Sequence, residues 1–214
     1  MTRLVLIRHG ESQVFVDRIV GGLIACNGLS ELGRRQATAL RDRLSATHEL
    51  DPVHLLVAST MPRARETAEI IAPALDGLEV VEDEAFCERH PGEADGMGYE
   101  DAIAKYGYDD FEDDPTTALS PGGETWIDFH DRITTAVRRV AADHGDSTVV
   151  IACHAGVIDA AIRGLLDLPM VGGFELFTQN TALSEFALVP ARDRRTERWR
   201  LVRYNDAAHL AGVS

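Results

Sequence analysis

The chain has 214 residues, of which 45% are hydrophobic and 26% are charged, and 35 Asp and Glu against 21 Lys and Arg give a formal net charge of −14. This is the composition of a globular protein, and the length allows one large domain or two small ones. The acidic balance argues against nucleic acid or an anionic membrane as the main partner, because both would repel it. The longest apolar runs are too short for a signal peptide or a membrane span, so a cytoplasmic location is expected.

The cysteines and the scattered histidines give no sign of a structural metal or disulfide. Three widely spaced cysteines, an odd number, disfavour a disulfide framework and a cysteine-based zinc site; they are Cys26, Cys87 and Cys153. Three further histidines show no ligand spacing with those discussed below, so no metal site is expected; they are His90, His130 and His144.

The first half of the chain alternates predicted strands and helices. The apolar run Leu4–Ile7 is typical of a strand buried on both faces. Ser30 suits a helix N-cap, and apolar residues follow it at helical spacing. A short strand is predicted at His54–Ala58 and a helix from about Pro62 to Ala74, where proline is tolerated in the first turn. Leu78–Val81 is the third predicted strand.

The second half begins with an irregular segment, residues 82–121, in which Asp109–Asp114 holds five acids in six positions. A strong amphipathic helix is predicted at Thr125–Asp143, and a buried strand at Val149–Ala152 leads into a helix at Ala155–Leu166.

The last part of the chain predicts two strands, Ala182–Val189 and Trp199–Tyr204, around the charged turn Ala191–Glu197. Because strands alternate with helices, the expected fold is α/β: a three-layer α/β/α sandwich with a mostly parallel central sheet. No repeat, linker or change in composition divides the chain. A single domain over residues 1–214 is therefore expected, with the segment of about 82–121 as an acidic lid.

Residues with phosphate-binding chemistry follow three of the predicted strands. Parallel sheets bind ligands at the carboxyl ends of their strands. His9 lies just after the first strand beside Arg8, and His154 follows the strand Val149–Ala152. Arg63 and Arg65 begin the helix after the second strand. Two imidazoles and up to three guanidiniums suit a dianionic phosphoryl group, since arginine offers a planar fork of donors and keeps its charge.

These motifs resemble those of the histidine phosphatase superfamily, the phosphoglycerate-mutase-like proteins. The signature Arg-His-Gly-Glu-Ser stands at residues 8–12, directly after the first strand. Five further matches follow in order: Leu29–Ala37, Ser59–Thr67, Glu88–Gly96, Pro121–Glu124 and His154–Ile158. Six ordered matches are far more specific than a single Arg-His-Gly.

The resemblance implies a role for each matching residue. His9 would be the nucleophile that takes the phosphoryl group, and Glu88 would give a proton to the leaving group. Arg8, Arg63 and His154 would complete the phosphate pocket. Two further residues are expected to bind substrate, and they are Ser12 and Ala155. The family's chemistry implies no metal or other cofactor, because the guanidiniums neutralise the phosphate charge.

Several assignments involve a choice between neighbours. The Arg-Ala pair within the motif selects Arg63 over Arg65, which is expected to face solvent or pair with an acid. The spacing of glycines favours Glu88 over the other acids of its segment, which are Glu84, Glu93 and Asp95. Cys153 is a structural residue on this interpretation, because adjacent strand residues point to opposite faces.

This chain departs from the family pattern at two places, both near where the leaving group of the substrate is expected to lie. Family members often carry Trp-Asn where this chain has Val14-Phe15, so one phosphate contact is expected either to be missing or to come from another residue, such as Ser12 or Gln13. They also commonly have Trp-Glu where this chain has Ala94-Asp95.

The expected activity is that of a histidine acid-type phosphatase, a phosphoric monoester hydrolase. It would hydrolyse a small metabolite with one phosphate and a neutral or cationic remainder. Tyr99–Asp114 holds seven acids and one lysine and would repel a second anionic group. A mutase is the alternative; a protein phosphatase and a non-catalytic binding member are weaker ones. Trp199–Ser214 could pack on a second copy of the chain in a homo-oligomer.

Overall fold

One mixed sheet forms the centre of the computed structural model, which describes residues 1–108, 111–172, 174–191 and 196–213. In this part of the chain the strand order is β3-β2-β4-β1-β5-β6. The strands are β1 (Arg3–Arg8), β2 (Leu55–Ala58), β3 (Val80–Glu82), β4 (Thr148–Cys153), β5 (Leu183–Pro190) and β6 (Glu197–Asp206). The first four strands in this list are parallel, whereas β5 runs antiparallel to β1 and pairs with β6 as an antiparallel ribbon. The mostly parallel sheet expected from the sequence is confirmed.

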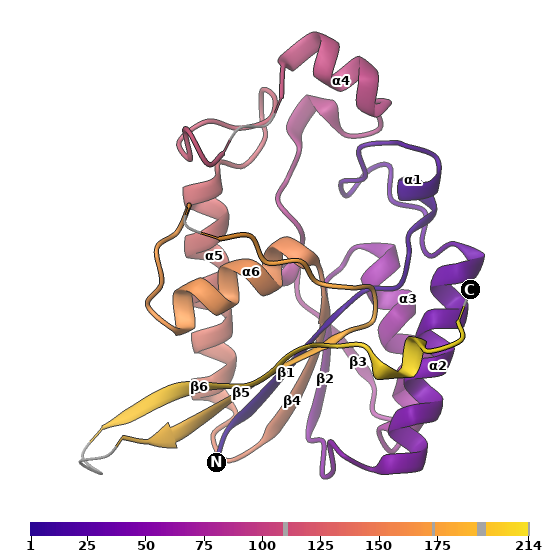
Figure 1. The fold of residues 1–214 in the computed structure, drawn as a ribbon, viewed down its shortest axis with the longest axis vertical. Coiled ribbons are helices and arrows are strands. Elements are labelled where there is room, and N and C mark those ends of the chain that lie inside the picture. The colour runs from indigo at the N-terminus through magenta and orange to yellow at the C-terminus, as the bar shows by residue number, and fades with distance from the viewer. Residues whose placement is uncertain (109–110, 173, 192–195, 214) are drawn as a thin grey trace.

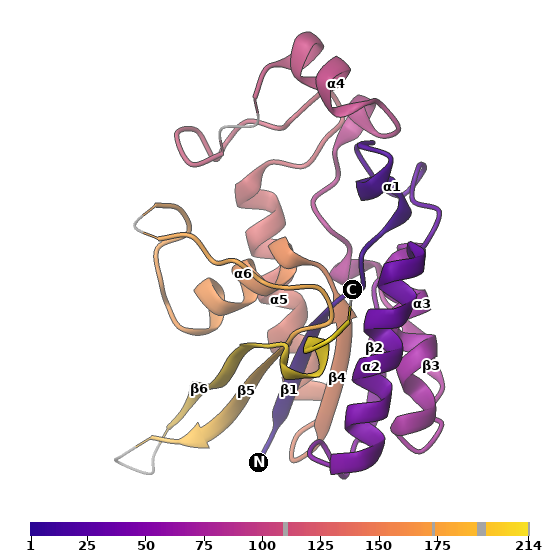
Figure 2. The ribbon, with the colours of Figure 1, turned by 45° about the vertical axis from the view of Figure 1, so that its right-hand side comes forward.

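Four long helices cover the two faces of this sheet. They are α2 (Glu31–Thr47), α3 (Pro62–Ile71), α5 (Trp126–Asp143) and α6 (Ala155–Leu165). Figures 1 and 2 show α2 and α3 on one face and α5 and α6 on the other. Alternate side chains of β1 supply both cores: Leu4 and Leu6 pack with α5 and α6, and Val5 and Ile7 pack with α2 and α3. The predicted three-layer sandwich is thus confirmed.

The helix ends follow from local hydrogen bonding. The Ser30 hydroxyl accepts the Gly33 amide at 3.0 Å, and the Thr125 hydroxyl accepts the Asp128 amide at 3.1 Å, so each caps the helix that follows. The helix predicted to run to Ala74 changes after Ile71 into a 3₁₀ turn, Ala72–Ala74, because Pro73 has no amide to continue the α-helical pattern. None of the helices in the described ranges is long and apolar enough to cross a membrane.

The segment 82–121 is more ordered than its sequence suggested. It contains the helix α4 (Tyr99–Tyr106) and the 3₁₀ turns Glu84–Phe86 and Gly92–Ala94. Figure 1 shows α4 beside the short helix α1 (Gln13–Val16), at the end of the molecule beyond the carboxyl ends of the parallel strands. Backbone bonds join the two regions: the Val20 amide donates to the Met97 carbonyl, and the Gly96 amide donates to Val20, both at 2.9 Å.

Parts of two predicted features lie outside the described residues. Asp109 and Asp110 belong to the acidic run, and residues 192–195 belong to the charged turn before β6. The third strand also differs from its prediction, because β3 begins at Val80 rather than at Leu78.

Candidate active site

The carboxyl ends of β1 and β4 bring two histidines together. Arg8 ends β1 beside Cys153, the last residue of β4, so His9 and His154 follow on adjacent strands. Their ring centroids are 5.1 Å apart. Arg63, in the first turn of α3, reaches both rings from the neighbouring strand–helix unit.

Hydrogen bonds determine which nitrogen of His9 carries the proton. Nδ1 lies 2.6 Å from the carbonyl oxygen of Gly10, which can only accept, so Nδ1 holds the hydrogen. Nε2 therefore keeps a lone pair, and it accepts a hydrogen bond from Nε of Arg63 at 3.1 Å. The nitrogen with the free lone pair is the one that faces the guanidinium.

His154 has the opposite tautomer. Its Nδ1 accepts from Nε of Arg63 at 3.2 Å, so the proton is on Nε2, which donates to the Ser59 hydroxyl at 2.9 Å. The Ser59 hydroxyl in turn donates to Sγ of Cys87 at 3.3 Å. Ser59 thus orients His154, and His154 helps to hold Arg63 against His9.

Both imidazoles are neutral at ordinary pH. Burial is the main cause that holds the pKa of His9 well below its usual value, and the Arg63 and Arg8 charges add to it. Burial and then the Arg63 charge lower the pKa of His154 in the same direction. A neutral imidazole is the nucleophilic form, so the environment keeps Nε2 of His9 ready to react.

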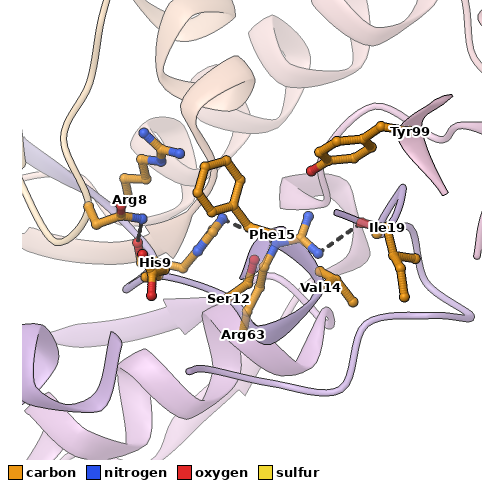
Figure 3. Close-up of a pocket in the computed structure, with 11 residues that line it drawn as sticks. Arg8, His9, Ser12, Val14, Phe15, Ile19, Arg63 and Tyr99 are labelled. Atoms are coloured by element: carbon orange, nitrogen blue, oxygen red, sulfur yellow. Dashed lines mark hydrogen bonds between the residues drawn. The ribbon is translucent and has the colours of Figure 1, made fainter. Parts of the chain in front are cut away.

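A cavity of about 160 Å³ opens in front of His9 (Figure 3). It is lined by Arg8, His9, Glu11, Ser12, Val14, Phe15, Ile19, Gly21, Arg63, Tyr99 and Asn180. Arg8 donates to the Thr178 carbonyl, and Nη1 of Arg63 donates to the Gly21 carbonyl at 2.9 Å. Both guanidiniums are therefore held at the wall of the His9 cavity, where they can neutralise a dianion.

Glu88 lies on the wall of a second pocket, which shares Gly21 and Tyr99 with the first. Oε2 of Glu88 accepts the amide of Gly156, in the first turn of α6, at 3.0 Å, and Oε1 accepts the amide of Arg89 at 3.0 Å. A Cβ on Gly156 would collide with Oε1, so glycine is required for this approach. The carboxyl is also close enough to Arg8, which lines the first pocket, for its charge to raise the pKa of that guanidinium against the larger lowering by burial.

The alternative candidates that the sequence analysis set aside do not line either of the two pockets. Arg65 is exposed, with Glu69 and Glu82 each 3.6 Å from its guanidinium. Glu93 accepts from the Tyr106 hydroxyl at 3.0 Å, away from both pockets described above. Asp95 accepts three backbone amides of the 22–25 loop at 2.8–3.2 Å.

Cys153 and Glu84 also lie apart from this chemistry. Cys153 packs in the core under α5 and α6, and burial raises the pKa of its thiol. Glu84 is exposed, in the 3₁₀ turn after β3.

Three of the remaining predicted residues have different surroundings. Ser12 lines the His9 cavity, as do Val14 and Phe15 from the departing motif. Gln13 donates to Asp17 at 2.8 Å on the exposed side of α1 and does not line the cavity. Ala155 begins α6 and is likewise absent from the lining.

The sequence did not single out Ser59 as an orienting residue, nor Asn180 and Tyr99 as part of the site. Nδ2 of Asn180 donates to the His9 carbonyl at 2.9 Å, and both Asn180 and Tyr99 line the cavity. Ser59 is the first residue of the matched motif Ser59–Thr67, so the sequence did contain a signal for it. Asn180 and Tyr99 lie outside every motif and reach the site through the fold alone.

Comparisons with known proteins point to one family. The family model for the histidine phosphatase superfamily (branch 1) matches residues 4–207. Phosphoglycerate mutase-like protein 4 of Arabidopsis thaliana is 32% identical over 212 residues, covering 97% of this chain and 86% of its own length. Glucosyl-3-phosphoglycerate phosphatase of Mycobacterium tuberculosis is 31% identical over 224 residues, covering 98% of this chain and 96% of its own.

A solved structure gives the same result for the fold. The mycobacterial glucosyl-3-phosphoglycerate phosphatase in complex with VO3 is 30% identical and has a TM-score of 0.76, covering 95% of this chain and 99% of that chain. The phosphatases among the relatives are consistent with the predicted phosphomonoesterase activity. The chain belongs to the histidine phosphatase superfamily, which confirms the resemblance carried by its motifs.

Proposed function

We propose that this protein hydrolyses small phosphomonoesters through a phosphohistidine formed on Nε2 of His9. The observation that carries the proposal is the tautomer of His9. Its Nδ1 donates to the Gly10 carbonyl, and its Nε2 lone pair is directed at Arg63 in a cavity that also holds Arg8.

In the first half-reaction the substrate phosphoryl group lies between the Arg8 and Arg63 guanidiniums. Nε2 of His9 attacks phosphorus, and the P–O bond to the leaving group breaks. The Glu88 carboxyl, in its protonated form, gives its proton to the leaving oxygen, so the product departs as an alcohol. His154, held by Ser59, keeps the Arg63 side chain in position.

In the second half-reaction a water molecule attacks the phosphorus, and the P–N bond to His9 breaks. The Glu88 carboxylate accepts a proton from the attacking water, which restores the acid for the next turnover. Inorganic phosphate leaves, and His9 returns to its neutral form. Neutral His9 is favoured by the burial that depresses its pKa.

The charge of the lid favours hydrolysis over the mutase reaction, in which the phosphoryl group would pass from His9 to a second hydroxyl. The described acids of the lid carry negative charge on the segment that contributes Tyr99 and Phe111 to the two pockets: Glu100, Asp101, Glu112, Asp113 and Asp114. They are exposed and would repel a second phosphate or a carboxylate over a distance of ~8 Å. A mutase that retains a bisphosphate needs the reverse charge.

The test is phosphate release from p-nitrophenyl phosphate in EDTA, compared between wild type, His9→Asn and His48→Asn. His48 is an exposed histidine on the far end of α2 and serves as the matched control. We expect His9→Asn to lose more than about 10³-fold in kcat/KM and His48→Asn to keep full activity.

Three results would contradict the proposal. Unchanged hydrolysis in His9→Asn would remove the nucleophile. Loss of wild-type activity in EDTA would show that a metal is needed. Faster isomerisation of 3-phosphoglycerate than release of phosphate from any substrate would make the protein a mutase.

Three expectations from the sequence remain predictions: the acid-type class, the cytoplasmic location and the homo-oligomer. The acid-type class is decided by the pH at which hydrolysis is fastest. The cytoplasmic location and the homo-oligomer are decided by fractionation and by light scattering.

A further inference from the structure

The second pocket, on whose wall Glu88 lies, has a volume of about 330 Å³. It is lined by Val20, Gly21, Glu88, Arg89, Pro91, Tyr99, Phe111, Leu119 and Trp126. Because Gly21 and Tyr99 also line the His9 cavity, a molecule with its phosphate at His9 would extend into this pocket. The carboxyl of Glu88 would then lie near the bond that breaks.

Aromatic rings dominate one wall of this pocket. Phe111 and Trp126 stack with ring centroids 4.4 Å apart and an interplanar angle of 24°. The indole nitrogen of Trp126 donates to the Met170 carbonyl at 3.1 Å, so the ring presents its carbon surface rather than its polar atom. Tyr99 closes the side that adjoins His9.

The Arg89 guanidinium extends this surface. Its central carbon lies 5.4 Å from the Phe111 ring centroid and 5.9 Å from that of Trp126. A guanidinium in this position offers a flat cationic face, which attracts the negative face of an aromatic ring. The aliphatic side chains of Val20, Pro91 and Leu119 complete the lining.

We propose that this pocket binds an aromatic ring of the leaving group, so that the preferred substrates are phosphomonoesters of aryl-alkyl alcohols. The inference rests on the proposed function, since it assumes that the phosphate binds at His9. A dry apolar cavity of about 150 Å³ is enough to hold a benzene ring, so this pocket has room for one. Offset stacking on Phe111 or Tyr99 and contact with Arg89 would orient it.

Selectivity between two alkyl phosphates is the first test. We expect kcat/KM for 2-phenylethyl phosphate to exceed that for ethyl phosphate by about tenfold or more, since the buried ring adds apolar contact. Both substrates release a primary alcohol, so the difference reports binding of the ring rather than leaving-group chemistry. A ratio near one overturns the inference, and so does a preference for O-phosphoserine over 2-phenylethyl phosphate.

A pair of leucine variants locates the effect. Leu119→Asn places a polar amide in the pocket and should lower the phenylethyl-to-ethyl ratio at least several-fold. Leu168→Asn changes an exposed leucine after α6, outside the lining, and should leave the ratio unchanged. Equal ratios in Leu119→Asn and wild type would place the ring elsewhere.

Binding of phosphonates separates this inference from the proposed function. By calorimetry, 3-phenylpropylphosphonate should bind wild type about tenfold more tightly than propylphosphonate, whether or not hydrolysis occurs. If p-nitrophenyl phosphate is not hydrolysed but this difference appears, the pocket assignment stands and the catalytic proposal fails. If hydrolysis occurs and the two phosphonates bind equally, the pocket assignment fails alone.

Discussion

At the scale of single residues, the chemistry depends on the bond that each imidazole makes with its unreactive nitrogen. The Gly10 carbonyl holds the proton of His9 on Nδ1, and the Ser59 hydroxyl holds that of His154 on Nε2. Arg63 then donates to the free nitrogen of each ring. One guanidinium can serve both rings only because their tautomers are opposite.

Glu88→Gln should separate its acid role from simple positioning. Glutamine keeps an oxygen for the Gly156 amide but has no proton to give as an acid. We expect kcat/KM for ethyl phosphate to fall by ~10²–10³-fold, whereas p-nitrophenyl phosphate, whose leaving group needs little protonation, should lose much less. Steady-state kinetics on both substrates provide the measurement.

The control for this prediction is Glu84→Gln, an exposed acid in the same segment. Its two kcat/KM values should match those of wild type. An equal loss on both substrates in Glu88→Gln would show that the carboxylate organises the site without transferring a proton.

Among the residues that sequence patterns located, those next to a strand end could also be placed in the fold. Arg8, His9 and His154 follow apolar runs, so their position at the sheet edge could be predicted. Asn180 could not, because its side chain reaches the His9 carbonyl across 171 positions from a stretch with no motif. Non-local contacts of this kind depend on the packing of β5 against β1, which periodicity does not specify.

At the scale of elements, the beginning of α6 sets the position of the proposed acid. The Gly156 amide in its first turn donates to Glu88, and first-turn amides of a helix are free for such bonds. Gly156→Ala would push the carboxyl away, because the new Cβ collides with Oε1. We expect ethyl phosphate hydrolysis to fall by about 10-fold or more, measured as kcat/KM.

Gly145→Ala is the matched substitution, since a Cβ there meets no atom of the described part of the chain within 4 Å. It should leave kcat/KM unchanged. Full activity in Gly156→Ala would show that Glu88 reaches the substrate from another position.

The short helices α1 and α4 show where sequence patterns are weak. α4 has eight residues, follows the N-cap Gly98, which has no side chain to make a cap bond, and buries only Ala102 in full. α1 has four residues and buries only Val14. Helices this short depend on tertiary contacts rather than on intrinsic propensity, so their hydrophobic pattern is too small to detect. The long amphipathic α5 has neither weakness.

At the scale of the whole molecule, the C-terminal segment supports the site from behind. His209, in the last 3₁₀ turn, bonds Thr181 at 2.8 Å, and the Thr181 amide donates to the Arg8 carbonyl at 2.8 Å. The Thr181 hydroxyl already donates to the Asn180 carbonyl, so Nε2 of His209 must be the donor. Nδ1 of His209 is then the unprotonated nitrogen, and it is buried without a hydrogen-bond partner among the residues that the structure describes.

This arrangement should make the protein less stable in mild acid. Burial first, and then the Arg43 charge, lowers the pKa of His209 to about 4. Between that value and the ordinary ~6.5 the unfolded chain binds a proton that the folded chain does not, so stability falls as the pH falls. Because His209 is partly exposed, screening by solvent limits its share to on the order of 1 kcal/mol.

Carboxylates act in a separate, lower window. Arg43 links α2 to β6 by pairing with Glu49 at 2.7 Å and with Asp206 at 2.6 Å. The Arg43 hydrogen bond lowers the pKa of Asp206, which therefore stabilises the fold above its ordinary value of ~3.9 and loses this effect only at more acidic pH. Loss of stability between pH 6.5 and about 5 thus reports histidines rather than this ion-pair cluster, whose Glu49 also has a lowered pKa.

His209→Gln tests the assignment, because glutamine can still donate to Thr181 and does not titrate. Thermal unfolding at pH 7 and at pH 4.5 should show a smaller drop in Tm for His209→Gln than for wild type. His9, His130 and His154, whose pKa values burial also depresses, contribute to the drop that remains. His48→Asn removes an exposed histidine and should keep the full wild-type drop. If His209→Gln also kept it, the C-terminal turn would not be the element that protonation destabilises.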